Sequence, residues 1–286
     1  MISFEMTRRT FLVSSIAAAS THFAFGQDEK LKVGCQLNGW GDKQGTFDGL
    51  VAVIQSAKEL GYAGYECNIR FVSGEFERAA EARKRLVATG MQFIGVHTSV
   101  MEAEKPGFAD LAKGASQLGA KNVVLSSAGL AADGKFTPEA LHAKAARVEA
   151  IAKVCRDNGV QLAYHNHMPE FANGNAEIQG LADNTNPQLV HFLMDAGHGY
   201  QGGGDPAAFM LHNSARIVGC HLKTFMNHTK QVPLGSGEFG FEALAKAIQQ
   251  VRWKGWLIDE EGGGPSGSNT AAVGPDREYI RKVFGV

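Results

Sequence analysis

The stretch from Gly159 to Phe171, GVQLAYHNHMPEF, is apolar up to Tyr164 and then turns abruptly polar. Alternate side chains of a β-strand point to the same face, so His165 and His167 are expected to share one side of it. A strand that is buried along its length and polar at its C-terminal end is typical of a parallel sheet with a site at that edge. Whether this pair faces such a site depends on how the other strands end.

Seven further apolar runs of strand type alternate with segments of helical period. In segments such as 47–61 and 137–159, apolar residues recur at spacings of three and four, and several such segments end at glycine, a helix stop signal. This alternation predicts parallel strands joined by helical crossovers. The eight runs cover residues 31–37, 63–69, 91–99, 122–127, 160–167, 189–198, 216–225 and 255–261.

Two α/β architectures fit eight such units, an open doubly wound sheet and a closed barrel. The 260 residues from 27 to 286 match the roughly 250 residues typical of a (β/α)8 barrel. The first run is not followed by the glycine-rich turn of a dinucleotide-binding sheet. The polar residues gather at the C-terminal ends of the runs, where barrel active sites lie. We therefore predict a single (β/α)8 TIM barrel over residues 27–286.

The first 26 residues differ from the rest in character. Residues 7–20, TRRTFLVSSIAAAS, join paired arginines to a short apolar stretch, and AFG at 24–26 offers small residues at the two positions that a signal peptidase inspects. RRTFL at 8–12 resembles a twin-arginine signal. The apolar stretch is shorter than the roughly 18 residues of a membrane span, which disfavours a stable anchor. We expect a removable signal over 1–26, recognition by the twin-arginine export machinery, and a periplasmic or otherwise exported protein.

Composition excludes several classes of function. The net charge of -1 provides no basic groove for nucleic acid and no attraction to an anionic membrane. The four cysteines are widely separated and match no zinc-finger spacing, so a disulfide is neither implied nor excluded. The sequence leaves open whether the chain forms a homo-oligomer.

Acid, imidazole and amine groups stand at the same end of six predicted strands. A lone histidine in a strand is usually a hydrogen-bonded structural residue, and Glu170 or Asp195 could simply cap the following helix. Repetition at six strand ends favours a shared site over independent caps. Imidazole and carboxylate together suit a divalent ion such as Mn²⁺, Co²⁺, Zn²⁺, Fe²⁺ or Mg²⁺. The residues concerned are Glu66, His97, His165, His167, Glu170, Asp195, His198, His221, Lys223 and Glu260.

Five motifs give the chain a specific resemblance: GYAGYECN at 61–68, AYHNH at 163–167, MDAGH at 194–198, GCHLK at 219–223 and GWLIDEE at 255–261. With them the chain resembles the sugar phosphate isomerase/epimerase superfamily, xylose isomerase-like barrels that include keto-sugar epimerases, inosose dehydratase and endonuclease IV. The resemblance implies a metal bound by His165, Asp195, His221 and Glu260. It also implies a substrate pocket that is lined by Glu66, His198 and Lys223. We expect His97 and His167, at the ends of neighbouring strands, to bind substrate there too.

The AYHNH motif departs from the family pattern, in which Glu-Asn-His often ends strand five. His165 stands where that glutamate binds metal and acts as a base, and Glu170 could supply the missing carboxylate. Glu260, Glu170 and His165 are therefore the candidate catalytic groups. We expect an isomerase or epimerase that takes a proton next to the carbonyl of an unphosphorylated keto-sugar.

Two other functions are compatible with the sequence. One alternative is a lyase or dehydratase that eliminates from a 3-keto-glycoside or an inosose-like substrate. A third reading is a barrel without catalysis that binds a sugar or a partner.

Overall fold

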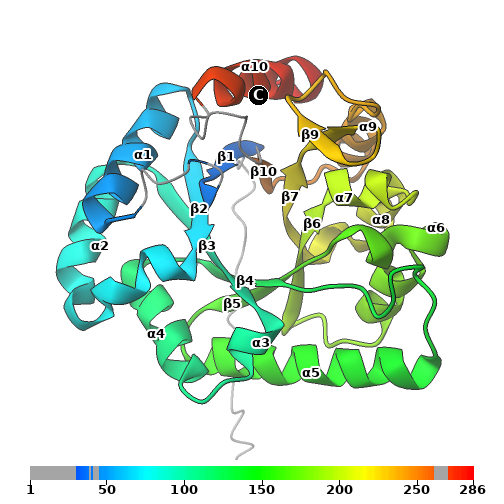
Figure 1. Cartoon of the computed structure of the whole chain (residues 1–286), viewed down its shortest axis with the longest axis horizontal. Helices are drawn as coiled ribbons and strands as arrows, with labels where there is room; N and C mark the ends of the chain where they lie inside the picture. Colours follow the sequence, from blue (N-terminus) through cyan, green and yellow to red (C-terminus); the bar gives the residue numbers. More distant parts are fainter. Residues whose placement is uncertain (1–29, 39, 41–44, 261–269) are drawn as a thin grey trace, which may run out of the picture.

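The computed structural model describes residues 30–38, 40, 45–260 and 270–286 of the chain. Eight parallel strands close into a barrel in which neighbours in sequence are neighbours in space, and the last strand pairs with the first (Figure 1). The predicted (β/α)8 barrel is confirmed, while the expected signal over 1–26 lies outside the described residues. The barrel strands are β1 (Lys32–Gln36), β2 (Gly64–Asn68), β3 (Gln92–Ser99), β4 (Asn122–Ser126), β5 (Gln161–His165), β6 (Val190–Asp195), β7 (Ile217–Leu222) and β10 (Trp256–Asp259).

Helices surround the barrel (Figure 1), and several begin at caps that the sequence encodes. Thr46 and Thr137 accept backbone N–H groups at the starts of two helices, and Pro138 occupies a first helical position where no N–H is needed. The α-helices are α1 (Phe47–Glu59), α2 (Ala79–Ala88), α3 (Val100–Ala103), α4 (Phe108–Leu118), α5 (Pro138–Asp157), α6 (Met168–Asp183), α7 (Ala196–Gln201), α8 (Pro206–Asn213), α9 (Glu242–Val251) and α10 (Thr270–Phe284). Short 3₁₀ turns are η2 (Ile69–Phe71), η3 (Ser73–Arg78) and η4 (Ser214–Arg216).

The barrel interior shows which face of each strand looks inward. Ala163, Leu193 and Ile258 belong to a small buried apolar cluster that is separate from the larger core between strands and helices. Because strand side chains alternate, the residues two positions further along these strands also point inward. Those residues include His165 and Asp195, so polar groups replace the apolar filling as each strand approaches the barrel mouth.

The sequence predicted one strand over residues 216–225, but the structure divides this run in two. Strand β7 ends at Leu222, and a two-stranded antiparallel hairpin follows, formed by β8 (Thr224–Met226) and β9 (Lys230–Val232). Asn227 and His228 turn the chain at the tip of this hairpin with φ of 53° and 54°, in the left-handed region that asparagine tolerates well. The break leaves Lys223 between the barrel and the hairpin, at the mouth.

Candidate active site

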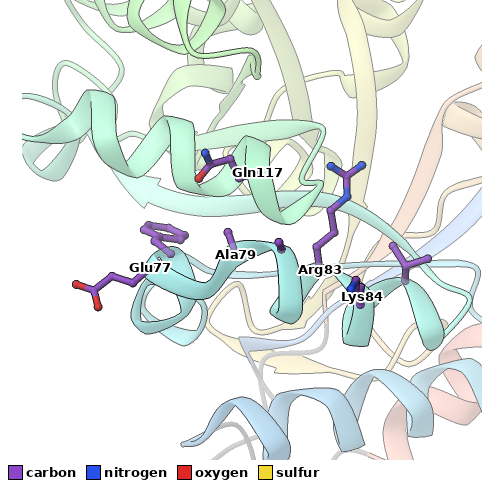
Figure 2. Close-up of a pocket in the computed structure, with 8 residues that line it drawn as sticks. Glu77, Ala79, Arg83, Lys84 and Gln117 are labelled. Carbon is purple, nitrogen blue, oxygen red and sulfur yellow. The ribbon is translucent and has the colours of Figure 1, made fainter.

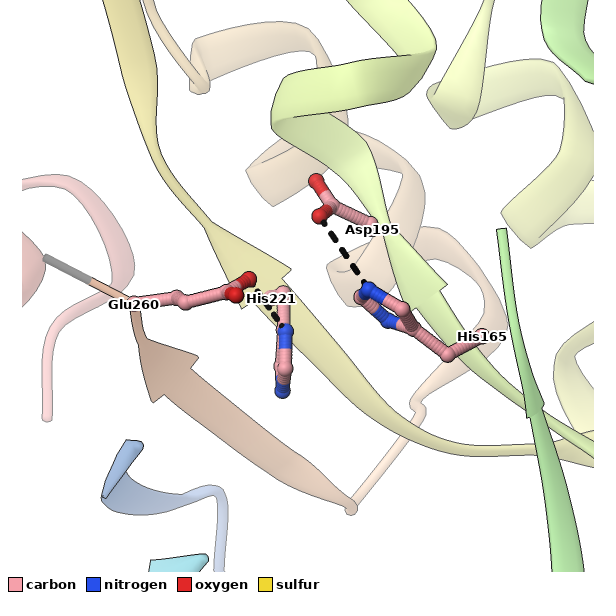
Figure 3. A group of neighbouring side chains, drawn as sticks. All are labelled: His165, Asp195, His221 and Glu260. Atoms are coloured by element: carbon pink, nitrogen blue, oxygen red, sulfur yellow. Dashed lines mark hydrogen bonds and ion pairs between the residues drawn. The ribbon is translucent and has the colours of Figure 1, made fainter. Parts of the chain in front are cut away.

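Four of the predicted residues meet inside the barrel mouth (Figure 3). His165, Asp195, His221 and Glu260 come from the ends of β5, β6, β7 and β10, and each offers one donor atom within 4.8 Å of the others. Parallel strands bring residues that are far apart in sequence to one rim, as the sequence predicted. Two imidazoles and two carboxylates at this spacing form a donor set suited to a divalent ion.

His221 lies between two carboxylates. Its Nδ1 is 2.6 Å from Glu260 Oε2 and its Nε2 is 2.7 Å from Glu66 Oε2, with the ring completely buried. Burial by itself would lower the pKa of His221, but the charges of Glu260 and Glu66 outweigh it and raise the pKa to about 10. Without a bound cation, the ring is therefore held as an imidazolium between the two acids.

Lys223 links the two carboxylates on the other side of the cluster. Its ammonium lies 2.8 Å from Asp195 Oδ2 and 2.8 Å from Glu260 Oε2. Burial would raise the pKa of Glu260, but Lys223 and His221 together hold it well below the usual range. Glu260 is thus a stable anion and a weak proton acceptor.

Asn166, for which no role was predicted, fixes the backbone of Asp195. Its amide donates to Asp195 O at 3.0 Å and accepts from Asp195 N at 2.9 Å, a two-point bridge between β5 and β6. The Asp195 carboxylate in turn accepts the backbone N–H of His198 at 2.8 Å and caps α7. Asp195 is therefore both a helix cap and a member of the donor cluster.

Gly197 lets α7 approach β7 closely. A Cβ at this position would stand 2.3 Å from Lys223 O, a backbone atom that has little freedom to move. Gly197→Ala is expected to destabilise the protein by about 2 kcal/mol through overpacking and to displace His198. Urea unfolding measures the loss. In the matched control Gly74→Ala in η3, the new Cβ meets no heavy atom within 4 Å, so stability should stay close to the wild type.

Glu66 and His97 lie deeper in the site than the sequence suggested. Glu66 Oε2 is 2.8 Å from His97 Nε2 as well as 2.7 Å from His221 Nε2, and both side chains are buried. These three residues form a second group of donor atoms that shares His221 with the first. Glu66 therefore belongs to the centre of the cluster and not merely to the border of a pocket.

His167 and His198 line the same side of the mouth. Their ring centroids are 4.9 Å apart, and His167 is 5.2 Å from His165. His198 Nε2 lies 3.8 Å from Asp195 Oδ2, and burial lowers the pKa of His198. The predicted substrate-binding histidines thus stand beside the donor cluster, at its more exposed edge.

The structure places Glu170 apart from this cluster, which argues against its predicted catalytic role. Its carboxylate accepts from Tyr164 Oη at 2.6 Å and from His167 N at 2.8 Å, and it lies 3.4 Å from Lys144 Nζ. Tyr164 precedes His165 in β5 and so points out of the barrel, into the helical layer. Glu170 follows it there and closes a capping box at the start of α6.

This position predicts a structural phenotype for Glu170→Gln. The amide cannot accept both the Tyr164 hydroxyl and the His167 N–H, so we expect a loss of about 1–3 kcal/mol of unfolding free energy. Metal affinity should stay within threefold of the wild type, as measured by calorimetric titration. If the variant instead loses metal binding but keeps normal stability, Glu170 contributes to the metal site and this structural role is wrong.

The donor cluster fits a metal ion on two further observations. Glu66 Oε1 and His165 Nδ1 are buried without a hydrogen-bond partner, which is costly unless another group binds there. Burial lowers the pKa of His165 well below its usual range, so the ring is neutral and keeps a free lone pair for a cation. His165, Asp195, His221 and Glu260 would hold the ion, with Glu66 beside them.

A separate hollow on the outer surface does not contribute to this site. It has a volume of about 640 Å³ and lies between α2 and α4 (Figure 2), lined by Phe76, Ala79, Arg83, Val87 and Gln117 among others. Its walls carry no histidine and come from the outer helical layer rather than from strand ends. The chemistry therefore resides at the barrel mouth.

The chain belongs to the family of xylose isomerase-like TIM barrels, whose model matches residues 54–283. Among curated proteins, an inosose dehydratase from Clostridium beijerinckii is 24% identical, over 90% of this chain and 98% of its own. A sugar phosphate isomerase/epimerase from Parabacteroides distasonis superposes with a TM-score of 0.67 at 17% identity, covering 92% of this chain and 97% of its own. The IolI protein, solved with a zinc atom, gives 0.70 at 12% identity over 89% of this chain and 98% of its own.

These comparisons identify an enzyme family and change the balance between the two predicted reactions. Two inosose dehydratases align along 90% of the chain, which favours the lyase alternative over the isomerase or epimerase that we expected first. No helix among the described residues is long and apolar enough to cross a membrane.

Proposed function

We propose that the protein is a divalent-metal-dependent dehydratase that removes water from a polyhydroxylated ketone of the inosose or keto-sugar type. The observation that carries this proposal is the outward position of Glu170. His165 replaces the strand-five glutamate, and Glu170 bonds Tyr164 in the helical layer instead of taking over that place. Epimerisation with one acidic base on each face of the sugar carbon is therefore disfavoured, whereas elimination needs one proton acceptor.

The reaction balances without any redox partner. The C–H bond next to the ketone breaks, its electrons form a new carbon–carbon double bond, and hydroxide leaves the β-carbon and takes up a proton as water. A bound divalent ion would polarise the ketone and stabilise the charge that develops on its oxygen. Lys223 and His198 stand beside the cluster, where they can bind substrate oxygens and move protons.

The proposed reaction can be separated from its rivals in one experiment. Full-length protein is purified with Mn²⁺ and incubated in D₂O with an inosose, a free ketose and a 3-keto-glycoside, and proton NMR follows each substrate. Loss of a β-hydroxyl with appearance of the unsaturated or diketone product supports a dehydratase. Deuterium in an epimerised sugar without loss of water would establish an epimerase, and release of the aglycone a glycoside lyase. If no substrate changes, the proposed enzyme function is wrong, and a barrel that binds a sugar or a partner without catalysis is the remaining function.

We also propose that the protein is exported by the twin-arginine route, on the strength of RRTFL at residues 8–12. Such export carries folded proteins, so the metal would be loaded before transport. Replacing both arginines with lysine should retain the protein in the cytoplasm, as fractionation would show. Unchanged periplasmic yield of that variant would overturn the assignment.

A further inference from the structure

The side chain of Gln201, at the end of α7, joins His198 to the β8–β9 hairpin. Gln201 Nε2 lies 2.5 Å from His228 O at the hairpin tip, and Gln201 Oε1 lies 2.9 Å from His198 Nδ1. A backbone carbonyl can only accept a hydrogen bond, so the NH₂ of Gln201 must face His228. The flipped amide, with its oxygen toward His228 O, would place two acceptors against each other and is excluded.

The orientation of Gln201 in turn fixes the tautomer of His198. Once the amide NH₂ faces the hairpin, only the amide oxygen is left for His198, and an oxygen acceptor requires that Nδ1 carry the hydrogen. A neutral imidazole has one N–H, so His198 Nε2 keeps a lone pair. This nitrogen lies 3.8 Å from Asp195 Oδ2, on the side of the donor cluster.

The hairpin also fixes the plane of the His198 ring. Phe225 in β8 stacks on it with ring centroids 5.6 Å apart and an angle of 25° between the planes. A second glutamine, Gln231 in β9, donates to Glu260 O at 2.5 Å and ties the other strand of the hairpin to the end of β10. The hairpin is thus attached to the site at two points, at Gln201 of α7 and at Glu260 after β10.

Three other basic groups of the cluster, Glu260, Glu66 and His221, are already engaged. Glu260 Oε2 has both His221 and Lys223 within 2.8 Å, and Glu66 Oε2 contacts two imidazoles. Both nitrogens of His221 face carboxylates. His165 belongs to the proposed metal-ligand set. Outside that set, His198 Nε2 is an acceptor beside the site, and so is His167 Nε2, because Ser127 O holds the hydrogen of His167 on Nδ1. Of these two rings, His198 is the one that the hairpin orients, through Gln201 and Phe225.

We propose that Gln201 is a positioning residue that holds His198 in its Nδ1–H tautomer, and that His198 Nε2 accepts the proton removed from the substrate carbon. The C–H electrons pass into the new double bond, and the imidazolium that forms returns its proton to the departing hydroxide. This assignment rests on the proposed dehydratase function for the reaction, but the tautomer itself is a property of the free protein.

The tautomer is tested first, without substrate. Full-length protein with ¹⁵N-labelled histidine is examined by two-bond ¹H–¹⁵N correlation, and His198 is assigned by the signals that vanish in His198→Asn. We expect hydrogen on Nδ1 in the wild type and in Gln201→Glu, whose carboxylate still accepts from Nδ1. Gln201→Leu should shift His198 toward the Nε2–H form. Hydrogen on Nε2 in the wild type, or no shift in Gln201→Leu, would overturn the proposal.

The catalytic consequence is tested separately. Gln201→Leu should lower kcat for dehydration by about 10- to 100-fold with KM changed less than threefold, and His198→Asn by at least 100-fold. The control Gln250→Leu changes an exposed glutamine on α9 and should match the wild type. An unchanged kcat in Gln201→Leu overturns the role. If the wild type dehydrates nothing, the proposed function fails, while the NMR result still decides the tautomer.

Discussion

Asp195→Asn is expected to abolish metal binding and dehydration while the barrel stays folded. Asparagine has nearly the same volume and caps a helix as well as aspartate, so the Oδ1 bond from His198 N at 2.8 Å can persist. What disappears is the negative charge at Oδ2, which lies 2.8 Å from Lys223 Nζ. An amide oxygen is a much poorer ligand for a divalent ion than a carboxylate, so we expect affinity to fall by about 100-fold or more.

The control for this variant is Asp205→Asn, because Asp205 is an exposed cap at the start of α8. Its side chain accepts Ala208 N at 3.0 Å, as Asp195 accepts His198 N, but it is not part of the donor cluster. Calorimetric titration with Mn²⁺ should give wild-type affinity for Asp205→Asn and little or no binding for Asp195→Asn. Equal affinity in the two variants would remove Asp195 from the metal site.

His221→Gln is expected to cost about 3–5 kcal/mol of unfolding free energy in the absence of metal. The imidazolium at the centre of the cluster contacts Glu260 at 2.6 Å and Glu66 at 2.7 Å. Its loss removes the positive charge that these two carboxylates share. Urea unfolding in EDTA measures the change. The exposed His212, which bonds only a carbonyl of its own helix, provides the control His212→Gln, expected within about 0.5 kcal/mol of the wild type.

A double variant checks the physical reason for that loss. Adding Glu66→Gln to His221→Gln removes one of the stranded charges, so part of the lost stability should return. If the double variant is less stable than His221→Gln alone, the cost comes from packing and not from unpaired charge.

The barrel and most of its polar rim were predictable because both depend on short-range patterns. The alternation of apolar runs and helical segments fixes the order of the elements, and a barrel then brings the strand ends together. His165, Asp195, His221 and Glu260 could be named as neighbours from this rule and from the family motifs, although they are separated by up to 95 residues.

Glu170 shows where sequence patterns mislead. Asp195 and Glu170 both follow a strand and both cap a helix, but Asp195 directly ends β6 on its inward face. Glu170 instead reaches back to Tyr164, which faces outward. The spacing of His167 and Glu170 as cap and third helical residue is the signal that favoured the structural role.

Gln201 and Asn166 were missed for a different reason. Both act through long-range hydrogen bonds, one from Gln201 to the hairpin tip and two between Asn166 and Asp195 in β6, and no local pattern specifies such partners. The hairpin itself was hidden because its first strand continues the apolar run of β7 after a single lysine. Spacing on α7, where Gln201 lies three residues after His198, is the one hint that the sequence offers.

The most direct test of this account is anomalous diffraction from crystals of the protein grown with Mn²⁺. We predict one strong anomalous peak bonded to Asp195, His221, Glu260 and His165, which define the first donor group. A peak bonded to Glu66 and His97 without Asp195 would contradict the assignment of the metal site. The absence of any peak at the barrel mouth would contradict metal-dependent chemistry altogether.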